Sequence, residues 1–196
     1  MKRICVFCGS SPGAKPEYLE AARELGRALA DKNIGLVYGG GNVGLMGQIA
    51  KAVLEKDGNV IGVIPKALAE KEVALTELDD LRIVESMHER KALMAELSGG
   101  FIALPGGLGT IEEFVEVLTW AQLGIHQKPC GLLNVCQYYK KFSDFLDHVT
   151  DQNFLEKGHR DIVLVDDDPH ALLTKFESYC PPSIDKAAWA LGMKNS

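Results

Sequence analysis

Three short glycine-bearing segments contain the residues of this chain whose types and spacing could hold an anion. They are Gly9-Ser10-Ser11-Pro12-Gly13, Gly39-Gly40-Gly41-Asn42-Val43-Gly44 and Pro105-Gly106-Gly107-Leu108-Gly109-Thr110. Glycine allows backbone N–H groups to approach a phosphate closely, and a helix that follows adds the positive end of its dipole. The three segments therefore predict a phosphate-binding site, provided that the fold brings them together.

Two of these segments match motifs of other chemistries, and each match lacks a necessary residue. Segment 39–44 satisfies the G-x-G-x-x-G pattern of dinucleotide sites, but segment 60–65, about 20 residues later, has no carboxylate to bind a ribose hydroxyl. Segment 9–13 matches the G-x-S-x-G elbow of hydrolases, but Pro12 lacks the N–H that would stabilise an oxyanion. The pattern thus disfavours NAD binding and serine hydrolysis, whereas anion binding by backbone amides stays open.

The third segment opens a predicted helix that carries acidic residues, namely Glu112, Glu113 and Glu116. Glu113 follows Thr110 by three residues, so the pair also fits a capping box, in which each side chain bonds to the other residue's backbone. A catalytic carboxylate and a helix cap are both open interpretations of Glu113.

A basic pair, Arg90 and Lys91, stands near the start of the preceding predicted helix. Arg90 interrupts an apolar stripe on one face of that helix, and the stripe consists of Met87, Met94 and Leu97. Either the arginine stem packs on the core while its guanidinium reaches water, or the guanidinium enters a pocket and holds an anion. The pattern alone leaves both open.

The elements that must position these residues follow from an alternation of short apolar runs with longer segments of helical period, which is typical of a parallel sheet with crossover helices. Candidate strands are 3–8, 35–38, 60–64, 81–84, 101–104, 130–133 and 162–165, and candidate helices are 16–31, 45–56, 87–98, 110–123, 138–150 and 169–179. We expect Asp168 to cap the last helix. The acidic run 166–168 is then a cap with solvated charge rather than a metal site.

The expected fold is therefore α/β: a single-domain, Rossmann-like doubly wound fold with a mainly parallel sheet of about seven strands. Residues 1–180 would form this domain, and residues 181–196 a peripheral C-terminal tail. Ligands of such sheets bind at the carboxyl ends of the strands, where the topology switches direction. Since each glycine-bearing segment follows a predicted strand, all three should meet at one edge.

The charge and the apolar runs of the chain argue against several classes of function. The chain has 196 residues and a formal net charge of −6, without a Lys/Arg cluster, which argues against non-specific binding to nucleic acid or a membrane surface. No apolar run approaches the roughly 18 residues of a membrane span, and the start does not fit a signal peptide. We therefore expect a cytoplasmic protein.

The five cysteines are an odd number, which favours reduced thiols over a disulfide framework. Cys5 and Cys8 match C-x-x-C, but residues three apart in a strand point to opposite faces, so the two sulfurs should not share a metal. We expect Cys5 and Cys130 to be buried in the core.

Together these motifs closely resemble the LOG ("Lonely guy") family of cytokinin riboside 5′-monophosphate phosphoribohydrolases. The resemblance extends from about Cys5 through the helix after Leu133. It rests on segments 6–11, 38–41, 44–47, 87–91 and 118–126, and on the P-G-G-x-G-T-x-x-E motif at 105–113.

The resemblance implies hydrolysis of the N-glycosidic bond of a nucleoside 5′-monophosphate, with Arg90 and Glu113 as the catalytic pair. It also implies that the nucleotide is contacted by Glu72, Lys91, Gly107, Leu108, Gly109, Thr110 and Thr119. The other glycine-bearing segments add Gly9, Ser10, Gly40 and Gly41 as phosphate-binding candidates. The partner would be a small-molecule nucleotide rather than nucleic acid or a membrane, the protein a homodimer, and the reaction would need neither a metal nor an organic cofactor.

Chemical principle is consistent with this assignment. Cleavage of a ribosyl–base bond passes through an oxocarbenium-like state, which a carboxylate such as Glu113 can stabilise while it activates water. Arg90 can hold the substrate or assist departure of the base.

Two further functions remain alternatives. A general AMP nucleosidase could use the same site, and only relative kcat/KM values would separate it from a cytokinin-specific enzyme. A non-catalytic carrier, like molybdenum-cofactor carriers, would share the fold and a similar glycine-rich motif, although Arg90-Lys91 upstream of Glu113 favours the enzyme. A pyridoxal-phosphate decarboxylase is disfavoured, because no lysine of the glycine-bearing segments is an obvious Schiff-base candidate.

Overall fold

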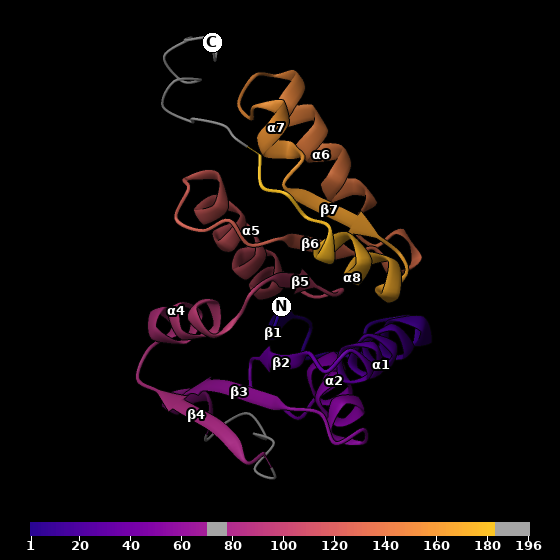
Figure 1. The fold of residues 1–196 in the computed structure, drawn as a ribbon, viewed down its shortest axis with the longest axis vertical. Helices are drawn as coiled ribbons and strands as arrows, with labels where there is room; N and C mark the ends of the chain where they lie inside the picture. Colours follow the sequence, from indigo (N-terminus) through magenta and orange to yellow (C-terminus); the bar gives the residue numbers. More distant parts are fainter. Residues whose placement is uncertain (70–77, 183–196) are drawn as a thin grey trace.

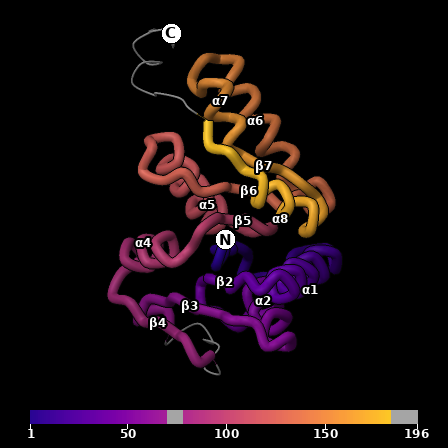
Figure 2. The backbone as a smooth tube through the Cα atoms, in the orientation of Figure 1, coloured from indigo at the N-terminus to yellow at the C-terminus, as the bar shows by residue number. Residues whose placement is uncertain are grey.

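The computed structural model describes residues 1–69 and 78–182, and these residues form one seven-stranded sheet of order β4-β3-β2-β1-β5-β6-β7. Every pair of neighbouring strands is parallel. The strands are β1 (Arg3–Phe7), β2 (Gly35–Tyr38), β3 (Val60–Pro65), β4 (Asp80–Val84), β5 (Phe101–Ala103), β6 (Cys130–Leu133) and β7 (Val163–Asp166). The chain builds the sheet outward from β1 to β4, and then returns to add β5, β6 and β7 on the other side of β1 (Figure 2). The predicted Rossmann-like α/β fold is thus confirmed.

Helices cover both faces of the sheet (Figure 1). They are α1 (Pro16–Asp31), α2 (Gly44–Leu54), α3 (Lys66–Ala69), α4 (Met87–Leu97), α5 (Leu108–Gln122), α6 (Lys140–Asp151), α7 (Lys157–Arg160) and α8 (Pro169–Glu177), with a 3₁₀ turn at η1 (Val135–Gln137). One core layer packs α1, α2 and α8 on the sheet, and the other packs α4, α5 and part of α6. The short α3, η1 and α7 were not predicted from the sequence, since none spans two turns of helical periodicity.

Strand β1 shows how the two core layers are separated. Ile4 and Val6 face the α1–α2 layer, whereas Cys5 and Phe7 face the α4–α5 layer. This alternation follows from the two-residue period of a strand. Cys8, just beyond β1, belongs to the α1–α2 layer, so Cys5 and Cys8 lie in opposite layers as expected. The five cysteines are free thiols, and Cys5 and Cys130 are fully buried.

The start of α5 differs from its prediction. The helix begins at Leu108, with Gly107 as its N-cap in an extended conformation, rather than at Thr110. Thr110 is therefore the third residue of the helix, and the capping-box interpretation of Thr110 and Glu113 is wrong. At the other end of the chain, the predicted cap of α8 is confirmed, because the Asp168 side chain accepts a hydrogen bond of 2.7 Å from Ala171 N.

Some expectations fall partly or wholly beyond the described residues. Glu72 lies outside them, as does the predicted tail from residue 183 onward. Within residues 1–69 and 78–182, none of the helices is long and apolar enough to cross a membrane. The same ranges contain no group of three or more His, Cys, Asp or Glu residues arranged to hold a metal ion, so Asp166–Asp168 is no such group.

Candidate active site

The three glycine-bearing segments meet at the carboxyl ends of β1, β2 and β5, where the strand order reverses. They bond directly to one another: Gly9 N donates to Pro105 O at 3.1 Å, and Leu45 N donates to Gly9 O at 3.0 Å. A Cβ atom at Gly106 would lie 2.1 Å from Thr110 Oγ1, so the close contact between residue 106 and Thr110 requires glycine at this position. The predicted convergence of the three segments is therefore found.

A cavity of about 230 Å³ opens beside these segments and contains both members of the predicted catalytic pair. Its lining is formed by Cys8, Gly9, Ser10, Met46, Leu68, Met87, Arg90, Gly107, Gly109, Thr110, Glu112 and Glu113. The cavity thus joins residues from separate parts of the chain at the sheet's switch point, which is where α/β proteins bind ligands.

The guanidinium of Arg90 points into this cavity rather than into solvent. Its Nε donates to Val63 O at 3.1 Å, and its Nη1 lies 3.3 Å from Glu113 Oε1. The side chain is 12% exposed, which rules out the snorkelling interpretation. Gly39 makes room for it, because a Cβ atom at that position would lie 2.2 Å from Arg90 Nη2.

Glu113 brings a buried carboxylate to the same cavity from the second turn of α5. Burial raises the pKa of this carboxyl group, the nearby charge of Arg90 opposes the rise, and the neighbouring Glu112 adds to it. Although Oε1 lies near the guanidinium, it accepts no hydrogen bond from the described residues, because the contact lacks hydrogen-bond geometry. Buried polar atoms are nearly always hydrogen-bonded, so this unsatisfied carboxylate oxygen marks Glu113 as a candidate functional group.

The N-terminus of α5 lies in the segment for which the sequence predicted an anion site. Gly107 cannot cap the helix with a side chain, so the N–H groups of the first turn receive no side-chain hydrogen bond within the described part of the chain. Free N–H groups and the helix dipole favour a phosphate at this position. Gly109 and Thr110 line the cavity here, whereas the Leu108 side chain is 87% exposed.

Lys91 lies next to the cavity but is held by two carboxylates. Its Nζ forms ion pairs with Glu112 Oε1 at 2.6 Å and Glu116 Oε1 at 3.1 Å. These contacts, led by the hydrogen bond to Glu112, raise the pKa of Lys91. A lysine that forms a Schiff base must lose its proton, so this environment is unsuited to that chemistry.

Several predicted contact residues lie away from the cavity. Gly40 and Gly41 are buried and do not line it, and a Cβ atom at Gly40 would lie 3.1 Å from the Ile64 side chain. Thr119 lies further along α5, where its hydroxyl donates to Val115 O at 2.7 Å. The predicted contact of Glu72 falls outside the described residues.

The apolar side of the cavity was missed by sequence reasoning. It is formed by Met46, Leu68 and Met87. Met87 was assigned to an apolar helix stripe, and none of the three carries a chemical group that could mark it as part of a site. Such residues would suit the apolar faces of a purine base.

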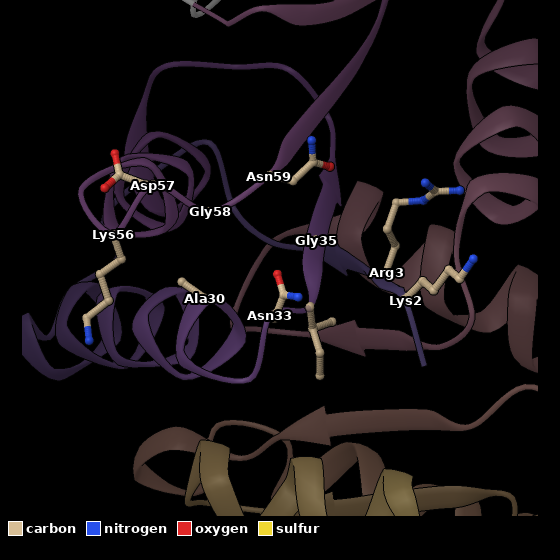
Figure 3. A pocket seen from close by; sticks show the side chains of 10 residues that line it. Lys2, Arg3, Ala30, Asn33, Gly35, Lys56, Asp57, Gly58 and Asn59 are labelled. Carbon is tan, nitrogen blue, oxygen red and sulfur yellow. The ribbon is translucent and has the colours of Figure 1, made fainter.

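A second cavity, of about 260 Å³, lies at the opposite edge of the sheet, near the amino ends of β1, β2 and β3 (Figure 3). Its charged side chains do not converge on a common point. Arg3 and Lys2 extend to one side, while Lys56 and Asp57 extend away on the other (Figure 3). Arg3 Nε donates to Leu97 O at 2.7 Å, and Lys56 pairs with Asp31. The cavity at the carboxyl ends is therefore the candidate active site.

Comparisons with known proteins identify relatives of this chain. Residues 46–176 match a family model described as "Possible lysine decarboxylase". The chain is 51% identical over 180 residues to the cytokinin riboside 5′-monophosphate phosphoribohydrolase LOG1 of Arabidopsis thaliana, covering 92% of this chain and 84% of the relative. It is also 51% identical over 180 residues to the probable cytokinin riboside 5′-monophosphate phosphoribohydrolase LOGL6 of Oryza sativa subsp. japonica, covering 92% and 72% respectively.

Solved structures share the fold at lower sequence identity. The molybdenum cofactor carrier protein of Chlamydomonas reinhardtii matches with a TM-score of 0.69 and 22% identity, covering 91% of this chain and 99% of that one. The molybdenum cofactor binding protein of Rippkaea orientalis matches with a TM-score of 0.67 and 23% identity, covering 91% and 97%. At this identity the likeness extends to the fold alone.

Proposed function

The chain belongs to the LOG family of cytokinin riboside 5′-monophosphate phosphoribohydrolases, and we propose that Arg90 and Glu113 carry out this reaction in the cavity at the switch point. The protein hydrolyses the N-glycosidic bond of a cytokinin riboside 5′-monophosphate and releases the free base and ribose 5-phosphate. The observation that carries the site assignment is a buried carboxylate 3.3 Å from a buried guanidinium, beside a helix N-terminus without a side-chain cap.

In the proposed mechanism, one part of the cavity binds the phosphate and another carries out bond cleavage. The first turn of α5 holds the 5′-phosphate, which fixes the ribose and places C1′ near Glu113. As the bond from C1′ to the base nitrogen breaks, the Glu113 carboxylate stabilises the positive charge on the ribose and takes a proton from the attacking water. The Arg90 guanidinium donates hydrogen bonds to the departing base, which carries away the electron pair and takes up a proton, while Glu113 releases the proton that it took from water.

The lysine decarboxylase named in the family model's description is a poorer match to this site. Lys91 follows Arg90 directly on α4, and its two ion pairs favour the protonated form of its amine. A pyridoxal-phosphate enzyme needs a lysine that can become neutral and attack a carbonyl carbon. Lys91 is therefore poorly suited to that role.

The test of the activity is chromatographic. The purified protein is incubated with AMP, with N6-isopentenyl-AMP and with the two corresponding nucleosides, and the free base and ribose 5-phosphate are quantified. We expect release from the monophosphates rather than the nucleosides, and faster release from the isopentenyl compound. Equal or faster release from AMP would instead identify a general AMP nucleosidase. If the folded protein releases no base, the proposed function is wrong and a carrier becomes the better assignment.

Gly39→Ala tests the space that Arg90 needs. A Cβ atom 2.2 Å from Nη2 must displace the guanidinium, and a displacement of about 1 Å can lower kcat/KM about a hundredfold. The free energy of unfolding should change by less than about 1 kcal/mol, because the displaced atom is the end of a flexible side chain.

Gly35→Ala is the matched control, because Gly35 begins strand β2 whereas Gly39 directly follows its end. There the new Cβ atom would meet the flexible Arg3 side chain at 2.9 Å, away from the cavity. Its kcat/KM should stay within about twofold of the native value. Equal losses in the two variants would show that the strand, rather than the position of Arg90, determines the effect.

We also propose that the protein is a homodimer, and that the outer face of α5 forms its interface. Exposed apolar side chains follow one another on this face: Leu108, Val115 and Leu123, with Ile125 just beyond the helix. Their spacing of seven and eight residues places the first three on one side of the helix. Exposed apolar stripes of this kind mark protein interfaces. Thr119 lies on the same stripe, where it would reach the nucleotide of a second copy more readily than that of its own.

Leu123→Asp is expected to convert the dimer to monomers, because a carboxylate would be desolvated in the apolar contact. The molar mass in solution is measured by light scattering over a range of protein concentrations. Phe145→Asp is the control, since Phe145 is 59% exposed on α6 rather than on α5. A native protein that is monomeric, or a Leu123→Asp variant that remains dimeric, would contradict the proposed interface.

The five free thiols favour a reducing compartment. We therefore propose that the activity is cytoplasmic. Separately, we propose that residues 1–180 form the catalytic domain. A net charge of −6 supports a small-molecule substrate over nucleic acid or an anionic membrane as the partner. We propose that hydrolysis proceeds without a cofactor, so that activity should survive dialysis against a chelator.

A further inference from the structure

Two consecutive tyrosines connect the end of β6 to the segment that carries the anion site. Tyr139 Oη donates to Leu104 O at 2.7 Å, and Tyr138 Oη donates to Gly106 O at 2.5 Å. These two carbonyl groups lie on either side of Pro105, immediately before the N-terminus of α5. The segment between β5 and α5 is therefore held from the neighbouring strand connection, more than 30 residues away in sequence.

The backbone that presents these tyrosines is strained. Cys136 and Gln137 have φ angles of +50° and +60°, so two successive residues other than glycine adopt the left-handed conformation. Asn134 stabilises this turn: its Oδ1 accepts a hydrogen bond of 2.7 Å from Tyr139 N, and its Nδ2 donates to Gln137 Oε1 at 3.3 Å. Strain of this kind persists where the surrounding contacts determine the conformation, and it is frequent near functional sites.

Gly107, which follows the carbonyl group held by Tyr138, has little packing of its own. Gly107 lines the catalytic cavity and also a third cavity, of about 330 Å³, which lies between the glycine-bearing segments and the rings of Tyr18 and Tyr138. A Cβ atom at Gly107 would have no neighbour within 4 Å. Since Gly107 lies between two cavities, the orientation of the peptide that joins it to Gly106 depends on the contacts of Gly106, and the hydrogen bond from Tyr138 is one of them.

We propose that Tyr138 is a positioning residue for the phosphate-binding turn at the start of α5. Its hydroxyl fixes the Gly106 carbonyl group, which orients the peptide that leads into the free N–H groups of the helix. Tyr139 is less suited to a separate functional role, because its ring is 3% exposed and packs in the core. Tyr138 is 41% exposed, so its hydroxyl can be removed with little loss of packing. The proposal rests on the proposed function only in taking the bound group to be a phosphate ester.

Tyr138→Phe tests the proposal by removing one hydroxyl group. The dissociation constants of ribose 5-phosphate and of inorganic phosphate are measured by calorimetry, and KM and kcat are measured with N6-isopentenyl-AMP. We expect both dissociation constants and KM to rise about five- to tenfold, as for loss of one hydrogen bond that orders the site, while kcat stays within twofold. The melting temperature should fall by no more than a few degrees.

Tyr18→Phe is the matched control. The Tyr18 ring packs edge-on against Tyr138 with centroids 5.7 Å apart, but its hydroxyl makes no hydrogen bond within the described residues. This variant should leave all the measured constants within twofold of their native values, and an equal effect in the two variants would assign the effect to the ring pair instead.

The proposal is overturned if Tyr138→Phe leaves ribose 5-phosphate binding and KM unchanged, or if kcat falls with KM constant. It is also overturned if the native protein binds neither phosphate compound. Phosphate binding that weakens in Tyr138→Phe, in a protein that hydrolyses no monophosphate, would support the positioning role while contradicting the proposed function.

Discussion

Glu113→Gln is expected to lower kcat/KM for a cytokinin riboside 5′-monophosphate about a thousandfold. The carboxamide keeps the shape of the side chain, but it can neither take a proton from water nor carry the negative charge that stabilises the ribosyl cation. The loss should appear in kcat rather than in KM, because the substitution leaves the proposed phosphate site at the start of α5 unchanged. Initial rates of base release over a range of substrate concentrations separate the two constants.

The native enzyme should show the ionisation of Glu113 in its pH–rate profile. Burial raises the pKa of this carboxyl group, so the acidic fall in kcat/KM should occur above the usual range of a glutamate. If kcat/KM stays constant as the pH falls to the ordinary carboxyl range, the reaction does not need the ionised form of a carboxyl group with a raised pKa.

The same substitution should not weaken the fold. Because the pKa of Glu113 is raised in the folded protein, the folded state binds this proton more tightly than the unfolded state does. Ionisation of Glu113 therefore lowers stability as the pH rises from the ordinary carboxyl pKa through the raised one. At neutral pH, Glu113→Gln should be as stable as the native protein or up to about 1 kcal/mol more stable, measured by urea unfolding.

Glu96→Gln is the control, because it makes the same change of charge at an exposed position on α4 outside the cavity. Its activity should stay within about twofold of the native value. If Glu113→Gln were inactive and also several kcal/mol less stable, the carboxylate would be structural and the catalytic assignment would be wrong.

The fold was predictable because each strand of a covered parallel sheet is a short apolar run between helices. The predicted strands 35–38 and 130–133 and helix 16–31 match β2, β6 and α1 in their bounds. The start of α5 was not predictable from its residue types. Thr110 is at least as good an N-cap as glycine by intrinsic preference, yet the helix begins earlier, where Gly107 leaves its N–H groups open. The proposed phosphate site at this helix start gives a reason for the departure from local capping preference.

The candidate site was predictable only where residue type implies chemistry. Arg90 and Glu113 were identified from their types and motifs, but the periodicity of α4 could not distinguish a solvent-exposed guanidinium from a buried one. The guanidinium is buried because Gly39, on the loop after β2, leaves space for it and the Val63 carbonyl group on β3 accepts a hydrogen bond from it. Both residues are distant from Arg90 in sequence. No sequence pattern identified Tyr138 as a site residue, because the carbonyl group that it contacts lies 32 residues away in the chain.

Arg90→Lys is the second substitution with a large expected effect, a loss in kcat/KM of about a hundred- to a thousandfold. The guanidinium uses Nε to bond to Val63 O and Nη1 to face Glu113, so two of its nitrogens act at once. A lysine ammonium retains the charge but has only one nitrogen, which cannot occupy both positions.

Arg82→Lys is the matched control for this exchange. Arg82 also uses two nitrogens, at 3.0 Å and 3.2 Å from the carboxylate oxygens of Asp80, but it lies half-exposed on the edge strand β4. Because exposed ion pairs contribute little, its replacement should leave both kcat/KM and stability close to the native values. An equal loss of activity in the two variants would contradict a specific role for Arg90.

Arg90→Met separates the charge of the guanidinium from its hydrogen bonds. The charge of Arg90 opposes the rise that burial causes in the pKa of Glu113, so its removal should raise that pKa further. The acidic fall in the residual kcat/KM should therefore move to higher pH in Arg90→Met, and should move less in Arg90→Lys, which keeps a positive charge. If the fall stays at the native pH in both variants, Arg90 acts on the substrate alone, and the ionisation of Glu113 is set by burial without its neighbour.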